Sequence, residues 1–296
     1  MQCKLTGKTY IYNHFRGYMK VLQTILSLIL LLQFPGYPQS VIKPESYTYK
    51  TIDTVALNLQ VYYPKRIKRN KKVPAVIFFF GGGWVSGNTG QFKPHCEYLA
   101  QQGMAGITAE YRIKNKHNTT PQDAIADAKS AMRWLKANAD KLNHDKNRII
   151  AAGGSAGGHL AACTATLDAF NDPSDDLNID PKPDGLILFN PVLNTAGFMD
   201  RFGGEKEVKE SSPIFHISET TPPTLIFHGT EDTVEPASTI LEFQKIMIGK
   251  ENTCEVILFG GEKHAFFNKG KKNDRPFHQT LVLMKQFLID EGYLVE

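Results

Sequence analysis

The stretch Gly153-Gly154-Ser155-Ala156-Gly157, followed by Gly158, constrains the fold of this chain more than any other feature. It separates an apolar run at 148–152 from a helix-like stretch at 159–163, a pattern that predicts a strand, a sharp turn and a helix. Small residues on both sides of the serine allow the backbones to approach closely at such a corner. The turn exposes the serine oxygen beside the N–H groups of a helix N-terminus, which favour negative charge. We therefore interpret Ser155 as a candidate nucleophile for acyl transfer, provided that its partners are found elsewhere in the chain.

The length of 296 residues is sufficient for one large α/β domain. The net charge is +4, but four basic residues and no acidic residue precede position 41, and the remainder carries 30 basic and 30 acidic residues. This balance predicts no basic surface suited to nucleic acid.

Residues 1–40 are predicted to be a signal peptide or N-terminal targeting segment, and residues 41–296 the catalytic domain. Met19-Lys20 precedes a short apolar run at 21–32, and turn-forming residues follow it. The run is shorter than the roughly 20 residues of a membrane-spanning helix. We expect a protein exported to the periplasm or secreted, with no stable membrane span after processing. An uncleaved anchor, a buried amphipathic start and a translation start at Met19 remain open.

The four cysteines, Cys3, Cys96, Cys163 and Cys254, are widely spaced. Their spacing matches neither a disulfide framework nor a zinc site, although one bridge stays open. Cys163 falls on the helix after the serine turn and is expected to pack in the core.

Strand-like and helix-like runs alternate from about residue 46 to the end. The strands expected are 46–53, 56–63, 73–80, 105–110, 148–152, 185–190, 224–228 and 254–259, the first two as an antiparallel pair at a sheet edge. The helices expected are 91–102, 121–138, the stretch after the serine turn, 237–248 and 276–291. The polar stretch 194–221 is interpreted as a small lid. This order predicts an α/β fold with a mostly parallel sheet of about eight strands and helices on both faces.

A serine nucleophile needs a base, and the base needs an acid that orients it. In a parallel sheet these groups lie on loops at the carboxyl ends of strands. His264 follows the last strand in a glycine turn and is the expected base. Asp232 follows the strand at 224–228, where Glu231 and Glu235 are rivals for the acid. His228, at the end of that strand, is expected to support the acid loop.

The run Phe80-Gly81-Gly82-Gly83-Trp84 follows another buried strand. Consecutive glycines allow backbone N–H groups to turn toward a ligand. We assign the oxyanion hole to the N–H groups of Gly82, Gly83 and Ala156. The run has neither the spaced acid of a dinucleotide site nor the lysine of a phosphate loop.

Together these motifs resemble the α/β-hydrolase superfamily, in its hormone-sensitive-lipase-like and acetylxylan/feruloyl-esterase-like (BD-FAE-like) branch. The similarity extends from about Ala56 to Glu291, and the order Ser155, Asp232, His264 is that of the family. The resemblance favours Asp232 over its rivals. It implies a lipase-like serine esterase that needs no cofactor and no metal, acting on a small ester or an esterified carbohydrate such as an acetylated or feruloylated polysaccharide. One departure is Phe80, where the family usually has histidine.

Two alternatives come from the same fold. A small amidase or peptidase would use the same residues, and ester and anilide substrates would distinguish it. A non-catalytic binding protein that kept the hydrolase fold is the third hypothesis, although such proteins typically lose the serine or histidine. Neither the oligomeric state nor the ester specificity follows from the sequence.

Overall fold

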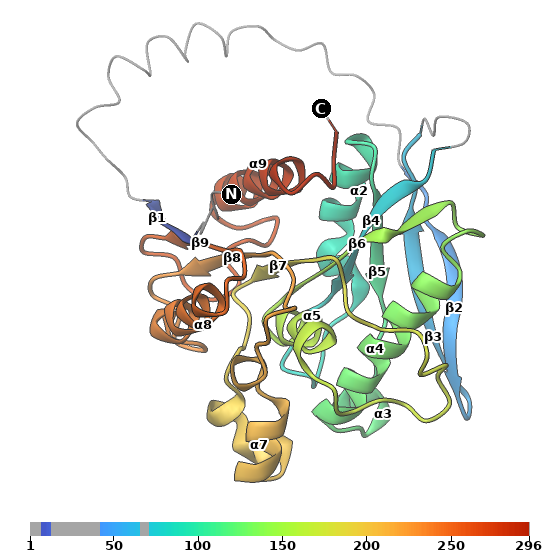
Figure 1. Cartoon of the computed structure of the whole chain (residues 1–296), viewed down its shortest axis with the longest axis horizontal. Coiled ribbons are helices and arrows are strands. Elements are labelled where there is room, and N and C mark those ends of the chain that lie inside the picture. The colour runs from blue at the N-terminus through green and yellow to red at the C-terminus, as the bar shows by residue number, and fades with distance from the viewer. Residues whose placement is uncertain (1–6, 13–41, 66–70, 296) are drawn as a thin grey trace, which may run out of the picture.

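The computed structural model describes residues 7–12, 42–65 and 71–295. One twisted sheet of nine strands runs through it in the order β1-β9-β8-β7-β6-β4-β5-β3-β2 (Figure 1). The strands are β1 (Gly7–Tyr12), β2 (Glu45–Ile52), β3 (Val55–Tyr62), β4 (Val73–Phe79), β5 (Ala105–Ala109), β6 (His144–Gly154), β7 (Gly185–Phe189), β8 (Thr224–Gly229) and β9 (Cys254–Phe259). Every pair of neighbouring strands in the part β1-β9-β8-β7-β6-β4-β5 is parallel, and β3 pairs antiparallel with both β5 and β2. The mostly parallel α/β sheet predicted from sequence is therefore confirmed.

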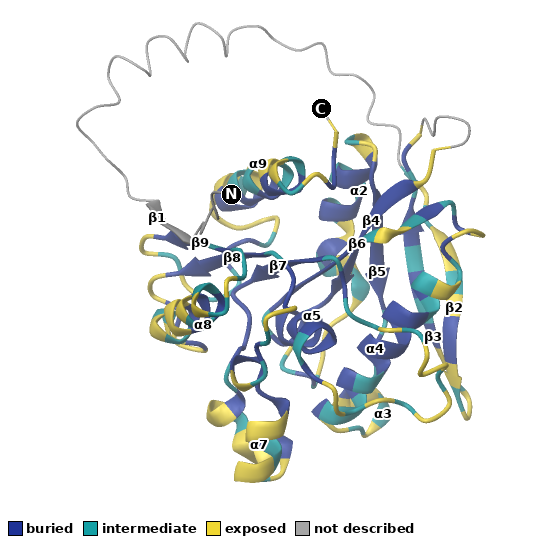
Figure 2. Cartoon of the chain, in the orientation of Figure 1, coloured by how far each residue is buried: buried dark blue, intermediate teal, exposed yellow. Residues whose placement is uncertain are grey.

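Helices cover both faces of the sheet, as expected for strands buried on both sides (Figures 1 and 2). The helices longer than one turn in the sheet-covering layers are α2 (Lys93–Gln101), α4 (Pro121–Ala137), α5 (Ala156–Thr166), α8 (Ala237–Gly249) and α9 (Arg275–Asp290). Side chains of α4, α5 and α8 pack in one core cluster, and those of α2 and α9 pack in the other. β4 shows why both faces are filled: Ile77 belongs to the first cluster and its neighbour Phe78 to the second.

The sequence expectation counted eight strands, which are β2–β9, and it missed β1. β1 pairs with β9 at the sheet edge and lies inside the segment 1–40 that we interpret as a targeting segment. The apolar run 21–32, on which that interpretation rests, lies outside the described residues. The export hypothesis and the boundary at residue 40 stay predictions. Among the described residues, no helix has the length and apolar character needed to cross a membrane.

The stretch 194–221 contains short helices that the sequence pattern did not predict. They are η2 (Thr195–Phe198), α6 (Met199–Phe202), α7 (Glu205–Ser211) and η3 (Pro213–Phe215), and a further short helix, α3 (Lys114–His117), follows β5. The remaining one-turn elements are η1 (Thr89–Phe92) and η4 (Lys272–Asp274). In Figure 2 the α7 region projects from the body and is largely exposed. Helices this short carry too few residues for a clear apolar period, so the sequence shows only a polar, glycine-containing stretch.

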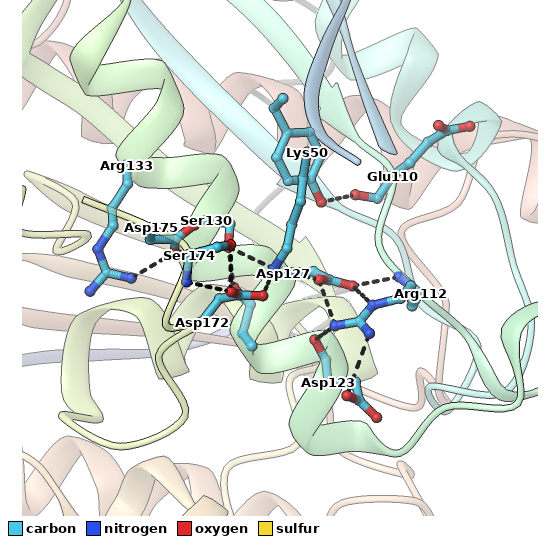
Figure 3. Close-up of polar contacts among 12 residues, drawn as sticks. Lys50, Glu110, Arg112, Asp123, Asp127, Ser130, Arg133, Asp172, Ser174 and Asp175 are labelled. Carbon is cyan, nitrogen blue, oxygen red and sulfur yellow. Dashed lines mark hydrogen bonds and ion pairs between the residues drawn. The ribbon is translucent and has the colours of Figure 1, made fainter. Parts of the chain in front are cut away.

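A buried ionic network joins the antiparallel edge of the sheet to α4 (Figure 3). Asp127 of α4 is fully buried and accepts hydrogen bonds from Arg112 Nε at 2.8 Å and Nη2 at 2.9 Å. Lys50 of β2 lies 3.1 Å from Asp127 Oδ1 and 2.5 Å from Asp172 Oδ2. Arg133 contacts Asp175 in the same loop at 3.2 Å. These ion pairs attach β2, the chain after β5 and the loop after α5 to α4.

Candidate active site

The turn from β6 into α5 carries Ser155 in a conformation that non-glycine residues rarely adopt, with φ 54° and ψ −121°. The close approach expected at this corner is present. A Cβ atom at Gly157 would lie 2.0 Å from the Phe79 carbonyl oxygen, and one at Gly153 would lie 2.3 Å from the Gly157 oxygen. Only glycine fits at these two positions, so the glycine pattern reflects backbone contact between β4, β6 and α5. Ser155 is consequently held at the carboxyl end of the sheet, where its hydroxyl points out of the strand.

The structure brings Ser155, His264 and Asp232 together from three loops that are far apart in sequence. The Ser155 hydroxyl donates to His264 Nε2 at 2.8 Å, and His264 Nδ1–H donates to Asp232 Oδ2 at 2.7 Å. The side chain of Asp232 is fully buried, whereas that of His264 keeps 21% of its surface exposed. The two bonds form a continuous path from the Ser155 hydroxyl to the buried Asp232 carboxylate, as a nucleophile, a base and an acid would require.

Asp232 is held as a carboxylate by its surroundings. Burial opposes its ionisation, but the hydrogen bond from His264, the backbone N–H of Val234 and the charge on neighbouring groups outweigh burial, and the pKa of Asp232 is lowered. Oδ1 accepts from the N–H groups of Val234 at 2.9 Å and Glu235 at 3.2 Å. Oδ2 is thereby directed at His264, which fixes the tautomer with the proton on Nδ1.

The rival acids lie elsewhere. Glu231 is exposed at the rim of the loop. Glu235 is buried, but its Oε1 accepts the N–H of Asn194 at 3.3 Å, so it faces the start of the 194–221 insertion. Burial raises the pKa of Glu235 to about 7. His228 Nε2–H donates to the Glu235 carbonyl, 3.0 Å away, and so supports the acid loop as the sequence indicated.

The glycine loop after β4 presents free backbone donors toward the same site. Gly82 and Gly83 have φ values of 131° and 62°, which glycine adopts readily. Within the described residues the N–H groups of both glycines have no hydrogen-bond acceptor, whereas Gly81 N–H donates to Gln91 Oε1 at 2.7 Å. Ala156 is the first residue of α5, where N–H groups have no partner inside the helix. Gly82 and Gly83 line the same cavity as Ser155, and Ala156 directly follows Ser155, so these three N–H groups stay the predicted oxyanion donors, while Gly81 is engaged in holding the loop.

Phe80 stands where the family usually has histidine, and its aromatic ring supports the start of the glycine loop. Its ring stacks on Tyr111 with centroids 4.1 Å apart, and the Tyr111 hydroxyl donates to the Phe80 carbonyl at 2.6 Å. On the other side of the loop, Gln91 Nε2 donates to Asn268 Oδ1 at 3.0 Å. Stacking, the Tyr111 hydrogen bond to the Phe80 carbonyl and the Gln91 hydrogen bond to Gly81 N–H thus fix the backbone at the start of the glycine run.

Three residues that the sequence did not single out face this site. Asn190, at the end of β7, accepts Ala265 N–H at 3.0 Å through its side-chain oxygen, and its Nδ2 lies 3.3 Å from His264 Nε2. Arg201 and Phe198 reach the site from the insertion. The position of Asn190 just after a buried strand was a usable signal, whereas nothing local in the sequence marks Phe198 or Arg201.

These residues enclose a cavity of about 450 Å³ that contains the Ser155 hydroxyl. Its walls are formed by the glycine loop, the acid and base loops and the insertion: Gly81, Gly82, Gly83, Trp84, Val85, Ser86, Gln91, Ser155, Asn190, Val192, Phe198, Arg201, Val234, His264, Ala265 and Phe267. In the described part of the chain, no group of three or more His, Cys, Asp or Glu side chains is arranged to hold a metal ion. Cys96, Cys163 and Cys254 are buried free thiols, so Cys163 packs in the core as expected.

Known proteins with similar sequences are mainly esterases. The BD-FAE family model matches residues 59–201, and the prolyl oligopeptidase family model matches residues 187–289. Esterase LipC of Mycobacterium tuberculosis is 31% identical over 66% of this chain and 54% of its own length. The acetylxylan esterase of Xylanibacter ruminicola is 24% identical over 68% of this chain and 42% of its own length. The chain spans about half the length of the curated relatives it matches.

Solved structures extend the similarity over nearly the whole fold. The apo form of Thermogutta terrifontis esterase 2 is 41% identical, with a TM-score of 0.83 over 88% of this chain and 99% of that chain. The same esterase phosphorylated by paraoxon is 42% identical, with a TM-score of 0.82 over 86% of this chain and 96% of that chain.

Proposed function

The chain belongs to the BD-FAE-like esterases of the α/β-hydrolase superfamily, and we propose that it hydrolyses carboxylic esters through Ser155, His264 and Asp232 by way of an acyl-enzyme. The observation that carries this proposal is the pair of hydrogen bonds, 2.8 Å and 2.7 Å long, that link the three side chains. The geometry is already that of a base in contact with its nucleophile.

In the first half of the reaction, His264 Nε2 takes the proton of the Ser155 hydroxyl as Oγ attacks the ester carbonyl carbon. The negative charge that develops on the carbonyl oxygen is stabilised by the free N–H groups of Gly82, Gly83 and Ala156. His264, now protonated and paired with Asp232, donates the proton to the leaving alcohol as the ester C–O bond breaks. In the second half, His264 deprotonates water, which attacks the acyl-enzyme and releases the carboxylic acid and Ser155.

The substrate proposed is a small ester or an esterified carbohydrate, with acetylated and feruloylated polysaccharides as the polymeric class. The family match and the acetylxylan esterase relative support this class. The cavity of about 450 Å³ is partly open to solvent, which suits an acyl group attached to a larger alcohol.

A small amidase or peptidase is the second candidate function. The observation that favours it is the match of the prolyl oligopeptidase family model to residues 187–289, the part of the chain that carries the acid and the base. Matched 4-nitrophenyl acetate and 4-nitroacetanilide decide between the two. Turnover of the ester alone supports the esterase, and faster turnover of the anilide supports the amidase.

The test of the mechanism is Ser155→Ala. We expect hydrolysis of 4-nitrophenyl acetate to fall by about 10⁵–10⁶-fold, because the base then has no nucleophile to activate. A fluorophosphonate probe should label the native protein and not the variant. Ser174→Ala, in a loop outside the cavity, is the matched control and should retain both properties. A Ser155→Ala protein that hydrolyses the ester, or is labelled by the probe, as the native protein does would refute the assignment.

We also propose that the protein is exported through residues 1–40. N-terminal sequencing of the secreted protein tests this proposal, and a mature chain that still contains residues 28–32 contradicts it. Cleavage near residue 40 would remove β1 and leave β9 as the edge of an eight-stranded sheet.

A further inference from the structure

Arg201 is an exposed cation of the 194–221 insertion that lines the catalytic cavity. It belongs to α6 and lines the same cavity as Ser155. Its Nη1 donates to the Gly83 carbonyl at 3.0 Å, and its guanidinium lies 5.2 Å from the centre of the Phe198 ring. Two contacts therefore position the group, although its side chain remains exposed.

Arg201 differs from Arg112, Arg133 and Arg148 in having no acidic partner within the described ranges. Arg112, Arg133 and Arg148 each contact an aspartate at 3.2 Å or less. Among the described residues no Asp or Glu forms an ion pair with Arg201, and the Gly83 carbonyl is its one hydrogen-bond acceptor. A guanidinium has five N–H donors, so most of this fork is available to a ligand.

The cavity itself favours an anion. Arg201 is the one Lys, Arg, Asp or Glu among the described residues that line it, and none of the lining residues is acidic. The opposing charge nearest the reaction, Asp232, is fully buried behind His264 and paired with it. A carboxylate on the substrate would consequently meet an unpaired, preoriented positive fork, whose planar geometry suits two parallel hydrogen bonds.

We propose that Arg201 selects esters that carry a carboxylate, and that its guanidinium binds this group while Ser155 attacks the neighbouring ester bond. The inference rests on the proposed esterase function and adds to it the chemical class of the substrate. The carboxylate can belong to the acyl part, as in a half-ester of a dicarboxylic acid, or to the alcohol part, as in an acetylated hydroxy acid. The recognition chemistry is the same in both cases.

The competing explanation is that Arg201 only attaches the insertion to the oxyanion loop through Gly83. In that case its removal would affect charged and neutral esters equally. The measured quantity is therefore the ratio of kcat/KM for a charged ester to kcat/KM for a neutral one of similar shape, because any general effect on the loop cancels in this ratio.

Two substrate pairs separate the two sources of the carboxylate. The acyl pair is the 4-nitrophenyl half-ester of adipic acid and 4-nitrophenyl heptanoate. The alcohol pair is 4-acetoxybenzoate and 4-acetoxybenzamide. Rates are corrected with Ser155→Ala, which reports hydrolysis that does not involve the nucleophile.

For the native protein we expect the charged member of at least one pair to be preferred by about tenfold, a modest factor because the guanidinium is exposed. Arg201→Gln should reduce that ratio to about one, mainly through KM, and Arg201→Lys should give an intermediate value because it keeps the charge and loses the fork. Added salt should lower the native ratio. Lys206→Gln removes the same charge from the same insertion outside the cavity, and should leave the ratio unchanged.

The proposal is overturned if neither charged ester is preferred, if Arg201→Gln lowers both members of each pair equally, or if Lys206→Gln has the same effect as Arg201→Gln. Failure of the proposed function is a different result. The native protein would then hydrolyse no member of either pair and a fluorophosphonate would not label Ser155, and the inference about Arg201 would be overturned with it.

Discussion

Replacement of Asp232 by asparagine should inactivate the site through the position of one proton. Oδ1 of Asp232 accepts two backbone N–H groups, from Val234 and Glu235, while Oδ2 accepts His264 Nδ1–H. An asparagine at this position must direct its oxygen to the two N–H donors, because its NH₂ group cannot accept from them. The NH₂ group then faces His264 Nδ1 and donates to it. His264 is held with its proton on Nε2, where it can no longer take the proton from Ser155.

The size of the effect follows from the tautomer. A triad with the wrong histidine tautomer loses about 10⁴ in turnover, which corresponds to about 5 kcal/mol of transition-state stabilisation. Asp232→Ala should lose less than Asp232→Asn, because it leaves Nδ1 free to carry the proton. This order of the two variants is specific to the geometry, since the loss of a charge alone would make them alike.

The assay is the steady-state kcat/KM for 4-nitrophenyl acetate, together with the rate of fluorophosphonate labelling. Thermal unfolding of each variant verifies that it is folded. Glu231→Gln is the matched control, because it removes a charge from the adjacent exposed residue, and its rate should stay within about threefold of the native rate. A folded Asp232→Asn enzyme within tenfold of the native rate, or one clearly more active than Asp232→Ala, would refute the reasoning.

Two further predictions concern stability. Lys50→Met should lower the free energy of unfolding by about 3–5 kcal/mol in urea titrations, because it leaves Asp172 without its ion pair beside the buried Asp127. Adding Asp172→Asn to this variant should recover part of the loss. A loss below about 1 kcal/mol would contradict a structural role for the network. Glu235→Gln should make the protein more stable than the native form above pH 7. The folded pKa of Glu235 is raised from 4.5 to about 7, so its neutral form is favoured in the folded state, and native stability decreases as the pH rises through that range. In urea titrations, the free energy of unfolding of the variant should exceed that of the native protein by up to about 3 kcal/mol at pH 8.5, and the difference should vanish near pH 4.5. A difference that becomes smaller from pH 4.5 to pH 8.5 would count against the buried charge.

Much of the fold follows from local patterns in the chain. Thr120 and Pro121 mark the start of α4, and the structure adds a capping box in which Thr120 and Asp123 satisfy each other's backbone. The turn around Ser155 is equally local, because Gly157 has room for no side chain beside the Phe79 carbonyl. Such signals depend on neighbours within a few residues, and they are legible in one sequence.

The limits of the sequence are clearest where elements far apart in the chain meet. The residues at the end of β8 offered three acids, among which the family resemblance favoured Asp232 but no local pattern did, and the structure directs Asp232 toward His264, 32 residues away. The role of Glu235 as a buried acid with a raised pKa depends on the insertion that covers it, and a sequence pattern carries no information about desolvation.

The sequence by itself determined that this chain forms a mostly parallel α/β sheet, where β2–β9 and the main helices lie, and the order in which a candidate nucleophile, acid and base follow the strands. The glycines required at tight turns and the periodicity of apolar residues are local properties, so they can be recognised in the sequence alone. The tertiary structure alone decided that the Phe80 ring stacks on Tyr111, that Asn190 adjoins His264, and that Arg201 lines the cavity of Ser155 with no acidic partner among the described residues. Each of these depends on the separation of atoms from distant segments, which the folded packing sets and no neighbour in sequence records.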